Sequence, residues 1–374
     1  LRTVCRVSQE VRDCYPPEES HDGTVLIFLI FNNPVMEFVL AAALAARNYN
    51  PILLTNRGSL PVETILKDYW KERAQLAVKH HNLTRFEREF DIPVHPIGAM
   101  LGSEHEHPTV DHLSAGDPFR YEDLEISPFV VASARRYLQR YRLDPSSSWH
   151  SRVYRDFLQA GAMIARAIGR VAQQYDVIAG IFTEGAYVHG GIPSAVLDKQ
   201  DIPAYLLGNG RIRNHIAAGL GRGGLSASDF DPPEVVTAVR TYEMTDADRG
   251  LLRDRLPQTS GEAHRHTTYA ADGDIGLPDS DRFSVGVFSH LLWDGALAPT
   301  AAVFPDFYEW LRCTIDTLAD QPEMDVYVKA HPAEELRGTD EHLSGWLDDT
   351  YPALPSHIEF IPPDSGISFY RMMT

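Results

Sequence analysis

Short apolar segments alternate with amphipathic ones along most of this chain. Residues 24–31 (Thr-Val-Leu-Ile-Phe-Leu-Ile-Phe) form a continuous apolar run, which is typical of a strand buried on both faces. Asn33 and Pro34 follow as a good N-cap and first helical residue, so the pattern predicts a helix over 34–47. Further strands are predicted over 51–55, 92–97, 176–182 and 204–207, and helices within 61–81 and over 127–142, 149–174 and 192–198. This alternation favours βαβ units and a parallel sheet.

A second block of the same kind follows a stretch rich in Gly, Asp, Arg and Ser. Its predicted strands cover 283–289, 325–330 and 357–361, with a helix over 305–319 and an earlier helix over 245–256. A chain of 374 residues is long enough for two domains. We therefore expect an N-terminal extension (1–23), a first domain (24–258), a linker (259–280) and a second domain (281–374). The chain stops inside a new predicted helix, so we expect the second domain to be incomplete.

Composition narrows the class of protein. A hydrophobic content of 44% with 23% charged residues is typical of a soluble globular chain, and no run approaches the ~18 apolar residues of a membrane span. The net charge of −18 argues against a nucleic-acid partner. Three scattered cysteines, Cys5, Cys14 and Cys313, suggest a reducing compartment, so we expect a cytoplasmic protein.

The predicted strand over 325–330 ends at His331-Pro332, where Pro332 cannot continue a ladder. Lys329, His331 and Glu334 should therefore lie at the carboxyl end of a strand, the edge where open α/β sheets bind ligands. A lysine and a histidine there suit an anionic ligand such as a nucleotide phosphate. Two simpler readings stay open: a hydrogen-bonded turn histidine, and an ion pair between Lys329 and Glu334.

The first block carries its own candidates at strand ends. Glu184 directly follows the strand over 176–182 and precedes a glycine, so it could take a proton from a hydroxyl; a capping or loop glutamate is the alternative. His189 precedes two glycines whose amides could be exposed to a phosphate, with a plain turn histidine as the alternative. Asn32 and Asn33 occupy the first strand-to-helix turn and could touch an acceptor, although helix capping alone explains Asn33.

The remaining sequence patterns do not indicate a binding site. The histidine pairs at 80–81, 105–107 and 264–266 lack carboxylates at tetrahedral spacing, so we expect no metal site. No GxGxxG motif is present, which argues against a dinucleotide cofactor. Residues 98–125 are expected to form a long loop, and 219–224, with Arg222, a flexible loop too irregular for phosphate.

Four landmarks of the second block occur in a recognisable order. They are 288–295 (Phe-Ser-His-Leu-Leu-Trp-Asp-Gly), the helix with Trp310, 328–334 (Val-Lys-Ala-His-Pro-Ala-Glu) and 361–370 (Ile-Pro-Pro-Asp-Ser-Gly-Ile-Ser-Phe-Tyr). This series resembles the capsule polysaccharide biosynthesis glycosyltransferases. The resemblance covers 283–370 well and the first block only diffusely. It implies an α/β fold of the GT-B type, with two Rossmann-like domains facing a cleft.

The resemblance also implies roles for residues. It makes His331 a contact to the phosphate of a nucleotide-sugar donor, with Lys329, Pro332, Glu334, His290 and Asp294 around it. It makes Glu184 the catalytic base, with His189 as rival, although Thr183 stands where such families have a second acid. Packing and turn formation are the alternative for 290–295.

The implied activity is metal-independent transfer of a sugar from a nucleotide-sugar substrate, with no further cofactor. The acceptor would be a glycan or lipid-linked glycan of surface or capsular polysaccharide, and the enzyme would associate peripherally with a membrane-bound assembly complex. Glycerophosphate transfer, nucleotide-sugar 2-epimerisation and a non-catalytic partner subunit remain alternatives. The sequence does not define the donor, linkage, acceptor or oligomeric state.

Overall fold

The computed structural model describes residues 21–29, 35–56, 59–62, 81, 83–88, 92–102, 109–183, 185–209, 216–221, 241–247, 249–250, 277, 280–294, 304, 306–337, 339, 341–367 and 372. The chain divides into two compact units. The first comprises Leu1–Leu138, Arg142–Asp231 and Leu297–Ala301, and the second comprises Gln139–Tyr141, Pro232–Ala296 and Ala302–Thr374. The predicted extension and linker lie almost entirely outside the described residues.

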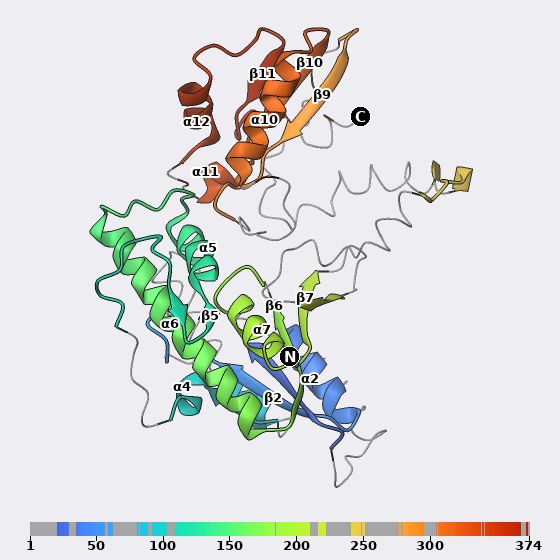
Figure 1. The fold of residues 1–374 in the computed structure, drawn as a ribbon. Coiled ribbons are helices and arrows are strands. Elements are labelled where there is room, and N and C mark those ends of the chain that lie inside the picture. Colours follow the sequence, from blue (N-terminus) through green and yellow to red (C-terminus); the bar gives the residue numbers. More distant parts are fainter. Residues whose placement is uncertain are drawn as a thin grey trace. The chain divides into compact units, whose positions relative to one another are not determined.

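The first unit is built on a six-stranded sheet with the order β3-β2-β1-β6-β7-β8 (Figure 1). Its strands are β1 (Thr24–Leu29), β2 (Asn50–Thr55), β3 (Val94–Pro96), β6 (Val177–Thr183), β7 (Ala204–Asn209) and β8 (Ile216–Gly221). Neighbouring strands are parallel, except that β8 runs antiparallel to β7. This is the doubly wound, Rossmann-like order, in which the direction of winding reverses between β1 and β6.

Helices cover both faces of this sheet. They are α2 (Val35–Ala46), α4 (Ile97–Met100), α5 (Ser127–Leu138), α6 (Ser148–Gln174) and α7 (Gly191–Asp198). Alternate residues of β1 enter different cores: Leu26 and Phe28 pack in the cluster that includes α5, α6 and α7, whereas Ile27 packs with α2. The continuous apolar run is explained by this two-sided burial, since both faces of the strand contact side chains.

The second unit contains a three-stranded parallel sheet with the order β11-β10-β9. Its strands are β9 (Phe283–Phe288), β10 (Met324–Lys329) and β11 (Ile358–Ile361), and its helices are α10 (Phe307–Ala319), α11 (Ala333–Arg337) and α12 (Leu343–Thr350). In its larger described core cluster, Val326 and Val328 of β10 pack among Leu311, Ile315 and Leu347. A smaller cluster joins Leu291, Trp293 and Ala333.

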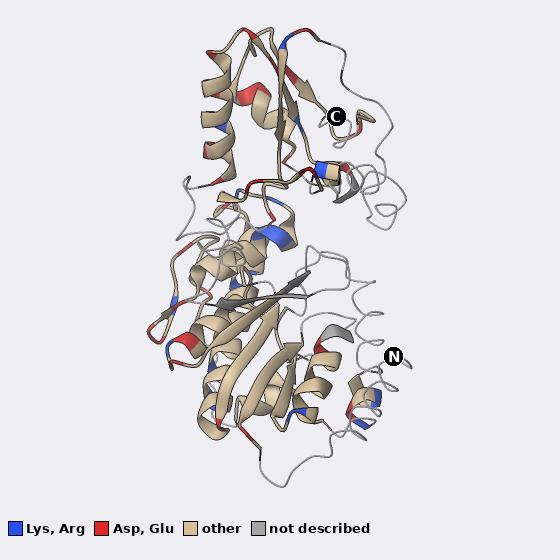
Figure 2. Ribbon diagram, turned by 90° about the vertical axis from the view of Figure 1, so that its right-hand side faces the viewer, with Lys and Arg blue, Asp and Glu red and all other residues tan. Residues whose placement is uncertain are grey.

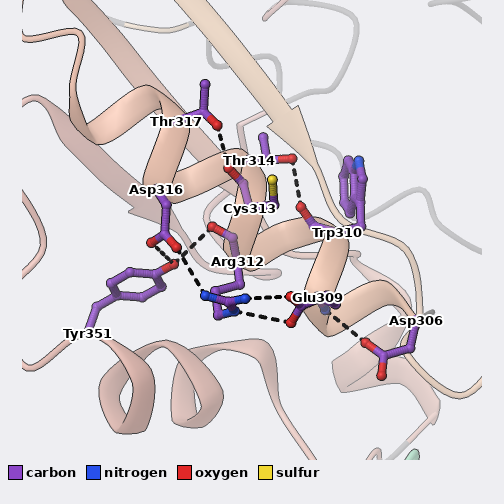
Figure 3. A network of polar contacts seen from close by, with 9 residues as sticks. All are labelled: Asp306, Glu309, Trp310, Arg312, Cys313, Thr314, Asp316, Thr317 and Tyr351. Carbon is purple, nitrogen blue, oxygen red and sulfur yellow. Dashed lines mark hydrogen bonds and ion pairs between the residues drawn. The ribbon is translucent and has the colours of Figure 1, made fainter. Parts of the chain in front are cut away.

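Local polar contacts define α10 (Figure 3). Asp306 is its N-cap and accepts a hydrogen bond of 2.8 Å from the backbone N–H of Glu309. Arg312 pairs with Glu309 and, at 3.4 Å, with Asp316. The Tyr351 hydroxyl donates to Asp316 over 2.8 Å and so ties the end of α12 to α10. These ion pairs are exposed, so each contributes little to stability beyond orienting the helix.

Two expectations from the sequence are wrong. Residues 216–221 form β8 rather than the start of a flexible loop, because β7 offers an edge whose backbone groups pair with glycine as readily as with larger residues. Residues 222–224 lie outside the described part. The stretch 98–125 is not simply a loop: α4 overlaps its start, and the antiparallel hairpin β4 (Arg120–Tyr121) and β5 (Leu124–Glu125) closes it.

Candidate functional site

In the first unit, the carboxyl ends of β1 and β6 adjoin each other at the point where the winding reverses. Such a switch point is the usual ligand crevice of a doubly wound sheet. Asn32 and Asn33 follow β1 in the sequence and Glu184 follows β6, but all three lie outside the described residues. The structure thus supports the position of this edge and leaves these three assignments as predictions.

His189 lies in the turn between β6 and α7. Its side chain is only 2% exposed, and its ring centroid lies 6.1 Å from that of Phe28 in β1. The turn is fixed to α5 because the Val188 N–H donates a 3.0 Å hydrogen bond to the Ser133 hydroxyl. His189 is therefore packed beside the central strand of the sheet.

The two glycines after His189 do not present their amides to a ligand, which corrects the sequence-based expectation. The N–H groups of Gly190 and Gly191 both donate to the Tyr187 carbonyl, over 3.1 and 2.8 Å. A Cβ at Gly191 would lie 2.3 Å from the Gly185 carbonyl oxygen and 2.3 Å from the Phe129 ring. Close packing therefore requires glycine at position 191. The two amides donate their hydrogen bonds to the Tyr187 carbonyl and are not available to a phosphate.

In the second unit, β10 ends at Lys329 and the chain turns at His331-Pro332. His331 Nδ1 accepts a 3.1 Å hydrogen bond from the Ala333 N–H, so the neutral ring carries its proton on Nε2. Burial, together with the nearby His290 and Lys329, holds the pKa of His331 below its usual range, although Asp294 opposes this shift. The structure therefore favours a neutral imidazole donor at neutral pH, and the permanent positive charge at this edge is that of the buried Lys329.

Two further side chains stand beside His331. His290, exposed at the end of β9, stacks on Phe307 with ring centroids 5.3 Å apart, and its ring lies 6.0 Å from that of His331. Ser289 is buried, and its N–H donates to the Lys329 carbonyl over 3.0 Å. Sequence reasoning missed Phe307 and Ser289. Only their positions in the sequence could have indicated them, because Ser289 follows a strand and Phe307 begins a helix.

The loop that carries His290 and Asp294 is anchored by Trp293. The indole is buried and donates a 3.0 Å hydrogen bond to the Thr339 hydroxyl, while the Thr339 N–H donates to the Glu334 carbonyl over 3.2 Å. Trp293 therefore packs and positions, as the structural alternative for this segment predicted. His290 and Asp294 are brought to the same edge as Lys329 and His331.

Glu334 has a different position from the one expected. It is 2% exposed, and its Oε2 accepts a 3.3 Å hydrogen bond from the Leu343 N–H at the start of α12. Burial raises the pKa of this carboxyl. The suggested surface ion pair with Lys329 is not found, because both side chains are buried and the basic side chain recorded beside the Glu334 carboxylate is that of His342, at 3.8 Å. In this structure Glu334 joins α11 to α12 behind the His-Pro turn.

Comparisons of the chain with protein-family models, with curated proteins and with solved structures found no match. The site must therefore be interpreted from its own chemistry.

The described part of the second unit gathers Ser289, His290, Lys329 and His331 at the carboxyl edge of a parallel sheet. These groups supply hydrogen-bond donors and one permanent positive charge, a set suited to a phosphate or another anion. Within the described residues, no group of three or more His, Cys, Asp or Glu side chains is arranged to hold a metal ion. The histidines at 80, 105, 107, 264 and 266 lie outside that part.

No helix of the described residues is both long enough and apolar enough to cross a membrane.

Proposed function

We propose that this chain is a glycosyltransferase of the GT-B type, which moves a sugar from a nucleotide-sugar donor to an acceptor of surface or capsular polysaccharide. The two units would be its two Rossmann-like domains, with the acceptor held by the first and the donor by the second. The motif series of the second block supports the donor assignment. The doubly wound strand order of the first unit is compatible with the acceptor domain.

The observation that carries this proposal is the donor edge, defined as Ser289, His290, Lys329 and His331 at the carboxyl ends of β9 and β10. A nucleotide phosphate needs donors and positive charge, and Lys329 with the Nε2–H of His331 provides both without a metal ion. Phe307, stacked on His290, extends this edge with an aromatic surface. A flat ring of this kind is suited to contact a base or a sugar.

The chemistry divides between the units. In the first, a carboxylate or imidazole accepts the proton of the acceptor hydroxyl, whose oxygen then bonds to the anomeric carbon of the sugar. The bond from that carbon to the nucleotide phosphate oxygen breaks, and the nucleotide leaves with the bonding electrons. Lys329 and His331 stabilise the negative charge that grows on the leaving phosphate. Glu184 is our preferred base, with His189 second, because His189 is packed against Phe28.

Calorimetric titration of the chain with CMP and with UDP tests the donor edge. We expect His331→Ala to weaken the binding of the preferred nucleotide by about 1–3 kcal/mol, the range for a hydrogen bond to a charged group. Lys329→Ala should also weaken binding, less strongly and with more sensitivity to salt. His357→Ala is the matched control, because His357 precedes β11 and so lies at the opposite, amino edge of the same sheet.

The pH dependence should have a defined sign. A protonated imidazole binds phosphate more tightly than a neutral one, and the pKa of His331 is lowered. Affinity should therefore rise only when the pH falls below the usual histidine range, and this rise should be absent in His331→Ala. Unchanged nucleotide affinity in His331→Ala would return this histidine to a purely structural turn.

A further inference from the structure

A second candidate binding site lies in the first unit, away from the carboxyl edge of its sheet. A cavity of about 470 Å³ lies among α6, α7 and the β4–β5 hairpin. Its helical walls come from the last turns of α6 and α7, the helices that lead into the amino ends of β6 and β7. Because strands of a parallel sheet share one direction, this places the cavity toward the edge opposite to the strand ends discussed above. It is large enough for a small-molecule ligand, since such pockets typically span roughly 300–1,000 Å³.

Three cationic side chains line this cavity, together with the carboxylates of Glu122 and Asp123 in the hairpin. Arg166 and Arg170 both line it, and they lie four residues apart on α6, a spacing that places side chains on one face of a helix. Arg170 is held by a hydrogen bond from its Nη1 to the Leu101 carbonyl. Lys199, the C-cap of α7, is held by Asp123 of the hairpin, with 2.7 Å between Nζ and Oδ2.

Arg166 differs from these two. It is half-buried in α6, and it makes no hydrogen bond or ion pair with any residue that the structure describes. A guanidinium has a rigid set of donors that matches a carboxylate or phosphate, and partial burial strengthens such a pair. Beside it, Gln173 and Gln200 bring amide groups that can both donate and accept hydrogen bonds.

We propose that this cavity binds a polar small molecule that carries one anionic group, of the class of sugar phosphates and sugar acids. Arg166 takes the anionic group. Gln173 and Gln200 take the hydroxyls, and the Tyr121 ring lies against the sugar. Lys199 and Asp123 keep the hairpin wall in place. The site does not depend on the proposed transferase activity, since it uses neither the donor edge nor the turn after β6.

Gly169 allows a sharp test, because it lines the cavity and a Cβ built there meets no atom within 4 Å. Gly169→Leu should therefore fill the cavity without disturbing the helix. Gly345→Leu in α12 of the second unit is the matched control, since its added Cβ also meets nothing. Arg166→Gln removes the charge and keeps a polar side chain of similar reach. Circular dichroism of each variant confirms that it folds.

The probes are inorganic phosphate, glucose 1-phosphate and glucuronate, titrated calorimetrically against the whole chain. We expect saturable binding of glucose 1-phosphate or glucuronate, weakened about tenfold or more by Arg166→Gln and by Gly169→Leu, a loss of about 1.4 kcal/mol. Gly345→Leu and His331→Ala should leave this binding unchanged. Preference for one of the two sugars tells phosphate from carboxylate ligands.

Three results would overturn the proposal. The first is no saturable binding of any probe, and the second is binding that survives both Arg166→Gln and Gly169→Leu. The third is loss of this binding in His331→Ala, which would assign the probe to the donor edge. If the chain binds the sugar anions but neither CMP nor UDP, the result counts against the proposed transferase and leaves the proposal for this cavity in place.

Discussion

The strands β3-β2-β1 of the first sheet and β11-β10-β9 of the second are arranged in the same way, but the two sheets differ in how far their strands are buried. In the first unit, β1 lies between β2 and β6, and every residue of β1 is buried. In the second, β9 occupies the corresponding place in the order β11-β10-β9 but is an edge strand among the described residues, with Phe283 70% exposed.

The strands of the two sheets also differ in their content of charged residues (Figure 2). The strands of the first sheet contain no Asp, Glu, Lys or Arg, whereas those of the second carry Asp325, Lys329 and Glu359. The histidines differ likewise, since His189 is packed inside its unit while His290 is exposed. A sheet whose strands are buried on both faces excludes charged side chains, whereas the second sheet carries the buried Lys329 at its carboxyl edge and the exposed Glu359. At the carboxyl edges of the two sheets, we therefore expect the second unit rather than the first to bind the charged phosphate of the donor.

The largest expected effect tests whether the first unit also does chemistry. If Glu184 is the base, Glu184→Gln should lower turnover by roughly 10²–10⁴-fold with little change in nucleotide affinity, because only the proton acceptor is lost. Release of CMP or UDP from the sugar donor is the measurement. His189→Ala is the paired variant. A near-normal rate in Glu184→Gln with a loss in His189→Ala would transfer the role to the histidine, and normal rates in both would leave the first unit without a base at this edge.

A second prediction compares glycines in the two sheets. A Cβ at Gly180 in β6 would lie 2.3 Å from Leu197 and 2.7 Å from the Phe182 ring, both fully buried, so Gly180→Ala should cost about 1–3 kcal/mol of unfolding free energy. At Gly286 in β9 the nearest atom would be 3.0 Å away, on the half-buried Phe288. Gly286→Ala should cost less. Urea denaturation measures both, and equal costs would contradict the difference in packing.

A third prediction uses the raised pKa of Glu334. A carboxyl whose pKa is raised in the folded state stabilises the fold below its ordinary pKa and loses that contribution as the pH rises through the raised value. Glu334→Gln cannot ionise, so its unfolding free energy should increase relative to that of the natural chain as the pH rises above the ordinary glutamate range. Parallel stability curves for the two proteins over this range would show that the carboxyl is not perturbed.

The smallest effect compares helix caps. Asp306 caps α10 in the second unit through Glu309, and Ser147 caps α6 in the first through the His150 N–H at 3.3 Å. Asp306→Ala should cost about 1 kcal/mol, the typical worth of an N-cap. Ser147→Ala should cost less, because its hydrogen bond is longer and α6, at 27 residues, is held by the core of the first unit. Thermal unfolding followed by circular dichroism measures both.

The sequence by itself determined most of the elements and the class of fold. The apolar run of β1, the amphipathic pattern of α6 and the β-branched residues of β10 are local signals, and each element lies within a few residues of its predicted place. The position of His331 at a strand end was also predictable, because Pro332 has no N–H to continue the ladder after the β-branched run.

Only the tertiary structure decided what these residues do there. The strand β8 exists because β7 has an edge to pair with, and no pattern in its own glycine-rich sequence signals that partner. Gly191 packs closely against Phe129 and Gly185, and the buried Glu334 accepts a hydrogen bond from the Leu343 N–H. Burial, pKa and the contacts between distant segments depend on which side chains meet across the fold, and a sequence read along one dimension does not contain those distances.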